Sequence, residues 1–307
     1  MSRRYSYLGP SGTFTEAALL QMPEAAEAER VPAASVLSAL SMVEAGEVDG
    51  AVVPIENSVE GGVTATLDAV SVANNLQIVA EALVPITFVL ASREPAPLSS
   101  IGTMATHSHA WAQVRQWVET SAPTAAYLPA SSTAAAAHGL LNDPPMADAA
   151  ICAPLVAEQL NLHVVASGIE DIAGAVTRFV LVTKPAAVPR HTGADKTTVM
   201  IPLPEDRPGA LMEILQHLTT RGVNICRIES RPTGSAMGDY FFSMDLEGHI
   251  EEARVAAALS GIHRISPQVR FLGSYPRADG KPQEVPGDVS EVAFSAAKTW
   301  VDSLRDR

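Results

Sequence analysis

Five short polar stretches in the first 183 residues each lie where an apolar segment gives way to a loop or a helix. They are Gly9–Glu16, Pro54–Val63, Thr106–His109, Ser131–Ala137 and Thr177–Phe179. Hydroxyls, backbone N–H groups at helix starts and a guanidinium recur among them, and such groups could hold an anionic ligand. Metal chemistry is not indicated, because the two histidines have no Asp, Glu or Cys at ligand spacing.

Each stretch also has a purely structural interpretation. For Gly9–Glu16 a turn with a capped helix is favoured, because the P-loop and dinucleotide patterns are missing. Pro54–Val63 follows a buried strand, where α/β proteins place ligands, and there ligand binding and helix capping are equally supported. Capping is the simpler explanation of Thr106–His109 and Ser131–Ala137. Arg178 suits either a bidentate carboxylate contact or a surface ion pair.

The composition is that of a globular protein with an excess of acidic groups. The 307 residues are 47% hydrophobic and 18% charged, with a formal net charge of −13. This charge argues against nucleic acid and anionic membranes as partners, and the apolar runs are too short to span a bilayer. The N-terminus lacks a signal-peptide apolar core, and Cys152 and Cys226 have no metal-type or redox-type spacing, so we expect a cytoplasmic protein.

The chain divides at a linker. Residues 184–196 combine prolines, glycine and charges without periodicity, as linkers do. Residues 1–183 alternate short apolar strands with helical patterns, which predicts an α/β domain with a largely parallel sheet. So many strands suggest two lobes with a cleft between them, and we expect the chain to cross between lobes near residues 92 and 178.

The second half predicts a smaller domain. Residues 197–275 read as strand, helix, strand, strand, helix, strand, the βαββαβ order of a split βαβ unit. Residues 276–307 begin as a loop and end with apolar residues at helical spacing, which predicts a helical tail that packs against another surface.

The order of the motifs along the chain resembles the prephenate dehydratase family. The motifs are Gly9-Pro10-x-Gly12-Thr13-Phe14, Pro54-Ile55-Glu56-Asn57-Ser58, Thr106-His107, Ser132-Thr133-Ala134 and Thr177-Arg178-Phe179. In the second half, Gly209-Ala210-Leu211 and Glu229-Ser230-Arg231-Pro232 resemble an ACT domain, a small module that binds a free amino acid. The resemblance covers roughly Tyr5 to Tyr275.

The resemblance implies a fold and an activity. The fold is α/β: a two-lobed catalytic domain like the periplasmic binding proteins, followed by a ferredoxin-like ACT domain. The implied reaction converts prephenate to phenylpyruvate with loss of water and carbon dioxide, on the route to phenylalanine. It requires no metal and no cofactor. The chorismate mutase domain of some fused relatives is expected to be absent, so the chain resembles the monofunctional form.

The resemblance also assigns site residues. Thr177 is expected to aim its hydroxyl at the departing ring oxygen, as a hydrogen-bond donor rather than an acid. Arg178 is expected to pair with a substrate carboxylate or to buttress the cleft, and Glu56 to act as the acid if burial raises its pKa. The substrate-binding residues implied are Thr13, Asn57, Ser58, His107, Ser132, Thr133 and Phe179. The family has Asn where this chain has Ala175, and Pro where it has Ser108.

In the second half, the resemblance implies a phenylalanine site between paired ACT domains. The residues assigned to it are Gly209, Ala210, Leu211, Asn224, Glu229, Ser230, Arg231 and Pro232. For Glu229 and Arg231 the structural alternative is a cross-strand ion pair. We expect phenylalanine to bind a less active state more tightly, and we expect a homodimer through the ACT domains, or a tetramer.

Two other functions remain open at this point. One keeps the fold and changes the substrate to arogenate, which differs from prephenate by an amino group. The other is a non-catalytic protein in which both halves sense ligands. A regulator of that kind would need a DNA-binding segment, and no basic helix-turn-helix pattern is visible in the sequence.

Overall fold

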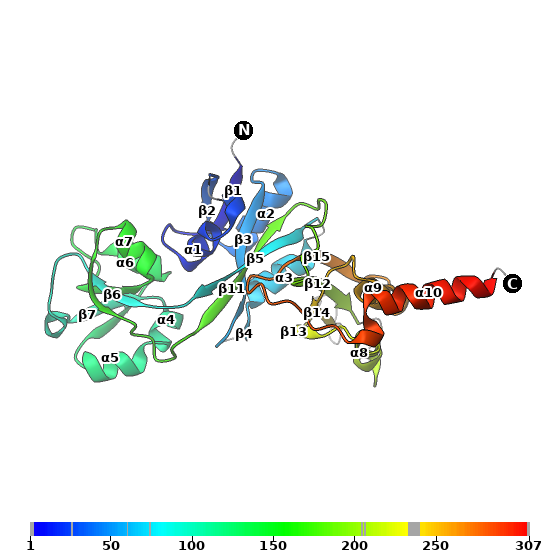
Figure 1. Ribbon diagram of the computed structural model, residues 1–307. Coiled ribbons are helices and arrows are strands. Elements are labelled where there is room, and N and C mark those ends of the chain that lie inside the picture. The colour runs from blue at the N-terminus through cyan, green and yellow to red at the C-terminus, as the bar shows by residue number, and fades with distance from the viewer. Residues whose placement is uncertain are drawn as a thin grey trace. The chain divides into compact units, whose positions relative to one another are not determined.

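The chain forms two compact units, each described here by itself. The structure, a computed structural model, describes residues 3–25, 27–59, 61–73, 75–203, 205, 207–232 and 240–305. The first unit comprises Met1–Thr66 and Ala82–Phe179, and the second comprises Leu67–Glu81 and Val180–Arg307. The expected α/β fold is confirmed (Figure 1).

The first lobe of the first unit is built on a mixed sheet. Its strand order is β2-β1-β3-β11-β5, with β4 added to β3. The strands are β1 (Arg4–Leu8), β2 (Glu29–Ala33), β3 (Gly50–Asn57), β4 (Gly61–Gly62), β5 (Gln77–Pro85) and β11 (Val176–Thr183). The helices α1 (Phe14–Leu20) and α2 (Val36–Ala45) pack on it through buried side chains such as Leu19 and Leu40. The 3₁₀ turn η1 (Pro23–Ala25) follows α1.

Local signals in the sequence set the limits of α2. Ser35 precedes it, and its hydroxyl accepts a hydrogen bond from the Ser38 backbone N–H, so an unsatisfied donor of the first turn is capped. Gly46 ends the helix with φ of 77°, the left-handed conformation that glycine adopts at low cost.

The second lobe has a sheet of its own, to the left in Figure 1. Its order is β10-β6-β9-β7-β8. The strands are β6 (Val89–Ser92), β7 (Thr103–Thr106), β8 (Ala126–Pro129), β9 (Ala149–Cys152) and β10 (His163–Ser167), and η2 (Leu98–Ser100) precedes β7. The helices are α4 (Ser108–Ala112), α5 (Arg115–Ser121), α6 (Thr133–Gly139) and α7 (Pro154–Gln159). Two apolar clusters, one around Met104 and Ile151 and one around Ala137 and Leu140, form its core.

The chain crosses between the lobes earlier than positions 92 and 178. It leaves the first sheet after Pro85 and enters the second at Val89, and it returns between Ser167 and Val176. Pro85 therefore ends one strand, and the next strand begins at Val89. Proline cannot donate a ladder hydrogen bond, so a break at this position is physically reasonable.

The second unit contains the predicted βαββαβ arrangement. Its sheet has the order β13-β14-β12-β15, and every neighbouring pair is antiparallel. The elements are β12 (Asp195–Pro202), α8 (Ala210–Thr219), β13 (Ile225–Pro232), β14 (Tyr240–Glu247), α9 (Ala253–Ile265) and β15 (Arg270–Pro276). Ile214, Leu218, Val255 and Ile262 of the two helices pack on Val199 and Met244 of the sheet. The βαββαβ order predicted for the second half is therefore confirmed.

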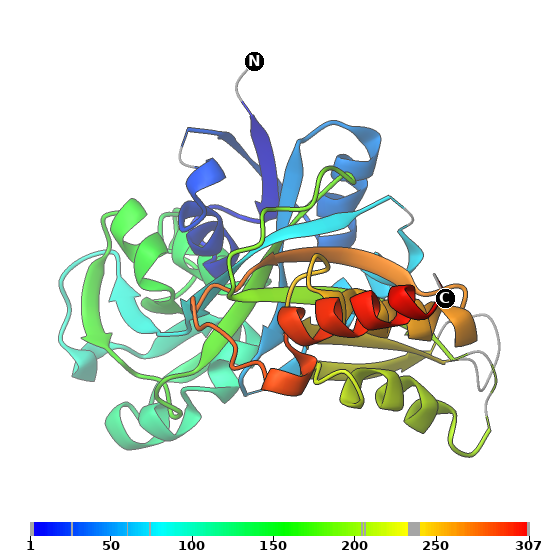
Figure 2. The same cartoon turned by 45° about the vertical axis from the view of Figure 1, so that its right-hand side comes forward.

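Two further elements complete the second unit. Helix α3 (Thr64–Val72) runs from the first unit into the second, and it is the helix that the capping interpretation of Pro54–Val63 implied. At the other end of the chain, η3 (Gly287–Val289) precedes α10 (Glu291–Arg305), the red helix in Figures 1 and 2. No described residue of α10 is buried. Among the described helices, none has the length and apolarity needed to cross a membrane.

Candidate functional site

A cavity of about 320 Å³ lies between the two lobes of the first unit. The first lobe contributes Leu8, Phe14, Asn57 and Thr177. The crossing segment contributes Ile86 and Phe88, and the second lobe contributes His107, His109, Ala110, Gln113, Ser131, Ser132 and Thr133. The polar motifs singled out in the sequence therefore meet in one place, although they are far apart along the chain.

Thr177 and Asn57 form a hydrogen-bonded pair in this cavity. The Asn57 side-chain Nδ2 donates to the Thr177 hydroxyl oxygen at 2.8 Å, and the Val59 backbone N–H donates to Asn57 Oδ1 at 2.8 Å. The second bond fixes which end of the amide faces Thr177. A hydroxyl has one proton, and the bond from Asn57 does not use it. Thr177 can therefore donate that proton to another acceptor.

Ser58 joins the ends of the two strands that carry this pair. Its backbone N–H donates to the Val176 carbonyl at 2.9 Å, and the Val176 N–H donates to the Ser58 hydroxyl oxygen at 2.9 Å. Ser58 is exposed and does not line the cavity. It fixes the start of β11, the strand on which Thr177 lies.

Glu56 and Arg178 pair with each other, one residue along from Asn57 and Thr177. Arg178 Nε donates to Glu56 Oε2 at 3.1 Å, and the Arg178 side chain is 5% exposed. Successive residues of a strand point to opposite faces of a sheet. Neither residue of this pair lines the cavity, and the next residue, Phe179, is buried in the core.

Two cavity residues of the second lobe cap helices. His107 precedes α4, and its Nδ1 accepts a hydrogen bond from the His109 backbone N–H at 3.3 Å. Ser132 precedes α6, and its hydroxyl accepts from the Ala135 N–H at 2.9 Å. Thr133, the first residue of α6, also lines the cavity. Here the capping role and the position in the site occur together.

Thr13 has a structural role in this structure. Its hydroxyl donates to the Leu8 carbonyl at 2.8 Å and accepts from the Glu16 N–H at 3.3 Å, and Thr13 does not line the cavity. The Glu16 carboxylate accepts from the Gly12 N–H at 2.6 Å and from the Ser11 hydroxyl at 2.9 Å. The anion held by this loop is thus the chain's own carboxylate.

Several cavity residues were given no role in substrate binding from the sequence. His109 and Gln113 lie four residues apart at α4, a spacing that places side chains on one helix face. Phe14 and Phe88 form the apolar part, with ring centroids 5.7 Å apart and nearly perpendicular planes. The four-residue spacing of His109 and Gln113, just after His107, could have indicated that both line the site. The contact between the two phenylalanines joins the lobes and has no local signal.

A second cavity, of about 280 Å³, lies in the second unit at the start of α8. Gly209 precedes the helix with φ of 89°. The cavity is lined by the predicted residues Gly209, Ala210, Leu211 and Ser230, together with Leu203, Arg207, Met212, Tyr240 and Phe242. Backbone N–H groups at a helix start and an apolar wall are the features that suit an amino acid with an apolar side chain.

Other residues assigned to the effector do not line this cavity. The Asn224 side chain donates to Glu247 Oε2 at 3.1 Å, and Arg231 pairs with Asp68 of α3 at 2.9 Å. Glu229 and Pro232, which are on β13, are also outside the described lining. Alternation along β13 explains why Glu229 and Arg231 are outside the lining, because Ser230 faces the cavity and its two immediate neighbours face away.

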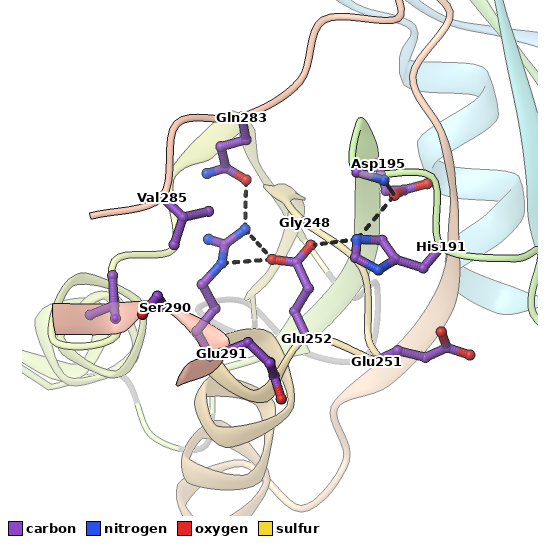
Figure 3. Close-up of a pocket in the computed structure, with 12 residues that line it drawn as sticks. His191, Asp195, Gly248, Glu251, Glu252, Gln283, Val285, Ser290 and Glu291 are labelled. Carbon is purple, nitrogen blue, oxygen red and sulfur yellow. Dashed lines mark hydrogen bonds and ion pairs between the residues drawn. The ribbon is translucent and has the colours of Figure 1, made fainter. Parts of the chain in front are cut away.

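A third cavity, of about 480 Å³, has no counterpart in the predictions (Figure 3). Arg254, which is buried, donates to Gln283 Oε1 at 2.6 Å and to Glu252 Oε2 at 2.7 Å. His191 Nε2 lies 3.5 Å from Glu252 Oε1 and 3.6 Å from Asp195 Oδ2. Arg254, Glu252, His191 and Asp195 of this cavity are therefore linked to one another. They tie the linker, α9 and the C-terminal loop together.

Within the described residues, no three His, Cys, Asp or Glu side chains are grouped so that they could hold a metal ion. Burial raises the pKa of the Cys152 thiol to about 12, and partial desolvation together with the nearby Glu247 carboxylate raises the pKa of the more exposed Cys226 to about 11. Both thiols are therefore protonated at neutral pH and unsuited to nucleophilic chemistry.

Comparison with known proteins identifies both halves. Residues 5–187 match the family model of prephenate dehydratase, and residues 198–264 match that of the ACT domain. A prephenate dehydratase of Mycobacteroides abscessus is 43% identical over 99% of this chain and 98% of its own length. The crystal structure of an Arthrobacter aurescens prephenate dehydratase in complex with L-Phe is 59% identical, with a TM-score of 0.94 over 99% of this chain and 100% of that one.

A more distant solved structure has a different description. It is named GqqA, a quorum-quenching acylase, and it is 28% identical with a TM-score of 0.79, over 89% of this chain and 98% of that one. The fold is thus shared beyond one activity. The family model and the relatives over the full length agree with the cavity motifs, and this chain belongs to the prephenate dehydratase family.

Proposed function

We propose that the cavity of the first unit binds prephenate and that Thr177 donates a hydrogen bond to its departing ring hydroxyl. The observation that carries this proposal is the 2.8 Å bond from Asn57 Nδ2 to the Thr177 oxygen. Because Asn57 already donates to that oxygen, the Thr177 proton points to another acceptor. Thr177 is 7% exposed, and a hydrogen bond in a site with little water is stronger than one in bulk solvent.

The reaction needs little acid strength from the protein. The ring carboxylate leaves as carbon dioxide, and the electrons of its C–C bond move into the ring. They expel the ring hydroxyl, which gains a proton and leaves as water, and phenylpyruvate remains. Aromatisation drives the step. Threonine is a weak acid, so it stabilises the charge that develops on the leaving oxygen, and the proton itself comes from a titratable group or from solvent.

His107 and His109 are our candidates for the substrate's carboxylates and for the proton. They are the titratable side chains among the described residues that line the cavity, and their ring centroids are 5.2 Å apart. No Lys or Arg is among those described lining residues. Histidine is the side chain that changes charge near neutral pH, so it can both pair with a carboxylate and pass on a proton.

Arg178 and Glu56 support the site from the opposite face of the sheet. Their 3.1 Å pair joins β3 to β11 beside the bond from Asn57 to Thr177. Removing the Glu56 carboxylate would take a charged partner from a guanidinium that is 5% exposed, which is costly. We therefore assign Arg178 the buttressing role rather than the carboxylate contact, and Glu56 the role of its partner rather than that of the acid.

The cavity at α8 is the proposed phenylalanine site. The carboxylate of the amino acid would meet the N–H groups that follow Gly209, and the ring would lie against Leu211 and Phe242. Support comes from the L-Phe complex of the Arthrobacter aurescens protein. Binding that is tighter in a less active state lowers turnover.

We also propose that two chains pair through the second unit. In the described part of the sheet, β13 is an edge strand, and it exposes Ile228. Met212 and Tyr240, which line the effector cavity, are 69% and 41% exposed. A second copy would cover these apolar groups and the open edge. Light scattering on the purified chain, with and without phenylalanine, measures the mass directly. A monomer under both conditions contradicts the pairing.

The activity test measures phenylpyruvate formed from prephenate, without added metal, at increasing phenylalanine. We expect turnover that phenylalanine suppresses. Arogenate is assayed in parallel, and turnover of arogenate alone would reassign the substrate. Binding of phenylalanine without turnover of either compound would favour a ligand sensor.

The role of Thr177 is tested by Thr177→Val, which keeps the shape and removes the hydroxyl. We expect kcat to fall by about 10²- to 10³-fold, with a small change in KM. Thr183→Val makes the same substitution on the same strand, outside the cavity, and serves as the matched control. Full turnover by Thr177→Val would remove Thr177 from the mechanism without changing the family.

A further inference from the structure

One ion pair in the second unit joins the effector motif to α3. Arg231 on β13 holds Asp68 through both of its carboxylate oxygens. Its Nη2 donates to Oδ1 and Oδ2, each at 2.9 Å, and its Nε donates to Oδ1 at 3.0 Å. The two residues are 163 positions apart in the sequence. A forked contact of this kind fixes direction as well as distance.

The Arg231 end of the pair is next to the effector cavity. Ser230, the preceding residue, lines that cavity, and Arg231 points to the other face of the same strand. A ligand that moves β13 at Ser230 therefore moves the Arg231 backbone as well. The side chains of Arg231 and Asp68 are 25% and 51% exposed, so the pair contributes little to overall stability, and its geometry is the more important property.

The Asp68 end of the pair is on the helix that begins next to the active-site loop. Before the helix, the Val63 N–H donates to the Ile55 carbonyl at 2.9 Å. In its first turn, the Thr66 hydroxyl donates to the Pro54 carbonyl. Pro54 and Ile55 lie on β3 just before Asn57, the residue that orients Thr177. Helix α3 is thus bonded at its start to the strand of the catalytic pair.

The last turn of α3 is bonded to the second unit by another arginine. Arg270 of β15 donates to the carbonyls of Ser71 and Ala73. These contacts are to backbone groups and lie on β15, which has no residue in the described lining of the effector cavity. The Asp68 contact differs because it is made by side chains and comes from the effector strand itself.

We propose that the Asp68–Arg231 pair couples the effector cavity to the substrate cavity. Phenylalanine at α8 shifts β13, Arg231 carries α3 with it, and α3 changes the position of Asn57 and hence of the Thr177 hydroxyl. The inference rests on the proposed phenylalanine site. The coupling is the factor by which phenylalanine changes the affinity for the substrate. The substrate changes the affinity for phenylalanine by the same factor.

The test is Asp68→Asn, which keeps the size of the side chain and removes its charge. Turnover without phenylalanine should stay within about twofold, because Asp68 touches neither cavity. Phenylalanine should still bind, as measured by calorimetry. Its effect on the KM for prephenate and on kcat should shrink by about fivefold or more, the lower end of typical coupling.

A charge exchange separates coupling from a loss of stability. Asp68→Arg alone should lose inhibition, and Asp68→Arg with Arg231→Asp should regain it. Asp279→Asn breaks another Asp–Arg pair of the second unit, with Arg277, and is the matched control. Inhibition of Asp68→Asn equal to that of the parent would overturn the coupling. A parent that phenylalanine neither binds nor inhibits would contradict the effector site instead, so the two failures can be told apart.

Discussion

The substrate cavity and the effector cavity differ in how far the chain has arranged them in advance. In the substrate cavity, Thr177 is 7% exposed and already accepts a hydrogen bond from Asn57, with the buried Arg178 behind it. In the effector cavity, Met212 and Tyr240 are 69% and 41% exposed. The chemistry depends on a fixed donor, whereas the effector site leaves apolar surface for a ligand or a second chain to cover.

The largest effect that would sharpen this comparison is expected from Asn57→Leu. It removes the amide that orients Thr177 and leaves the Thr177 hydroxyl in place. A hydroxyl free to rotate is misdirected for part of the time, and we expect kcat to fall by about 10²-fold. Steady-state kinetics measures the loss, and calorimetry should find phenylalanine affinity unchanged. Normal turnover would show that the bond between the two side chains is incidental.

A smaller effect is expected at Gly209, and on regulation alone. With φ of 89°, Gly209 adopts a conformation that costs a β-branched residue about 1–2 kcal/mol, so Gly209→Val should weaken phenylalanine binding about tenfold. Gly209→Asn is the control, because asparagine tolerates this conformation. The comparison predicts unchanged turnover in both variants. A loss of turnover equal to the loss of inhibition would contradict the separation of the two cavities.

The smallest effect is expected at Asp279, which lies in neither cavity. The hydrogen bond from Arg277 holds the pKa of Asp279 well below its ordinary value. A depressed pKa stabilises the fold above the unfolded-state pKa of about 3.9 and loses that contribution as the pH falls below it. Asp279→Asn should therefore cost about 1 kcal/mol or less at pH 7. Thermal unfolding should show the difference shrinking as the pH falls from about 4 to about 2, towards the depressed folded-state pKa, with kinetics at neutral pH unaffected.

Local patterns predict much of the fold but leave the cavity residues ambiguous. The βαββαβ order followed from helix and strand periodicity, and it is confirmed in the second unit. The local patterns around Asn57, Ser132 and Thr177 fitted capping or ion pairing as well as ligand binding, and the resemblance to the prephenate dehydratase family assigned these residues to the site. All three line the cavity.

What the sequence could not predict depends on distant neighbours. Helix α3 carries the β-branched residues Thr64, Thr66, Val70 and Val72, which lower helix propensity, so the sequence indicated a helix after Pro54–Val63 but not its limits. The ion-pair partners of Arg178 and Arg231 could not be predicted from the sequence either. Each guanidinium pairs with a carboxylate more than 100 positions away, and a residue pattern does not specify such a partner.

The bond from Asn57 to Thr177 also has a consequence for inhibitor chemistry. The Thr177 oxygen already accepts a hydrogen bond from the Asn57 amide, so its own O–H can donate to a ligand in the cavity. A compound that places a ketone, N-oxide or sulfone oxygen at this position satisfies that donor. An ammonium group at the same position has only donors and cannot accept the hydrogen bond from Thr177. Selection of compounds for this pocket should therefore begin from acceptors.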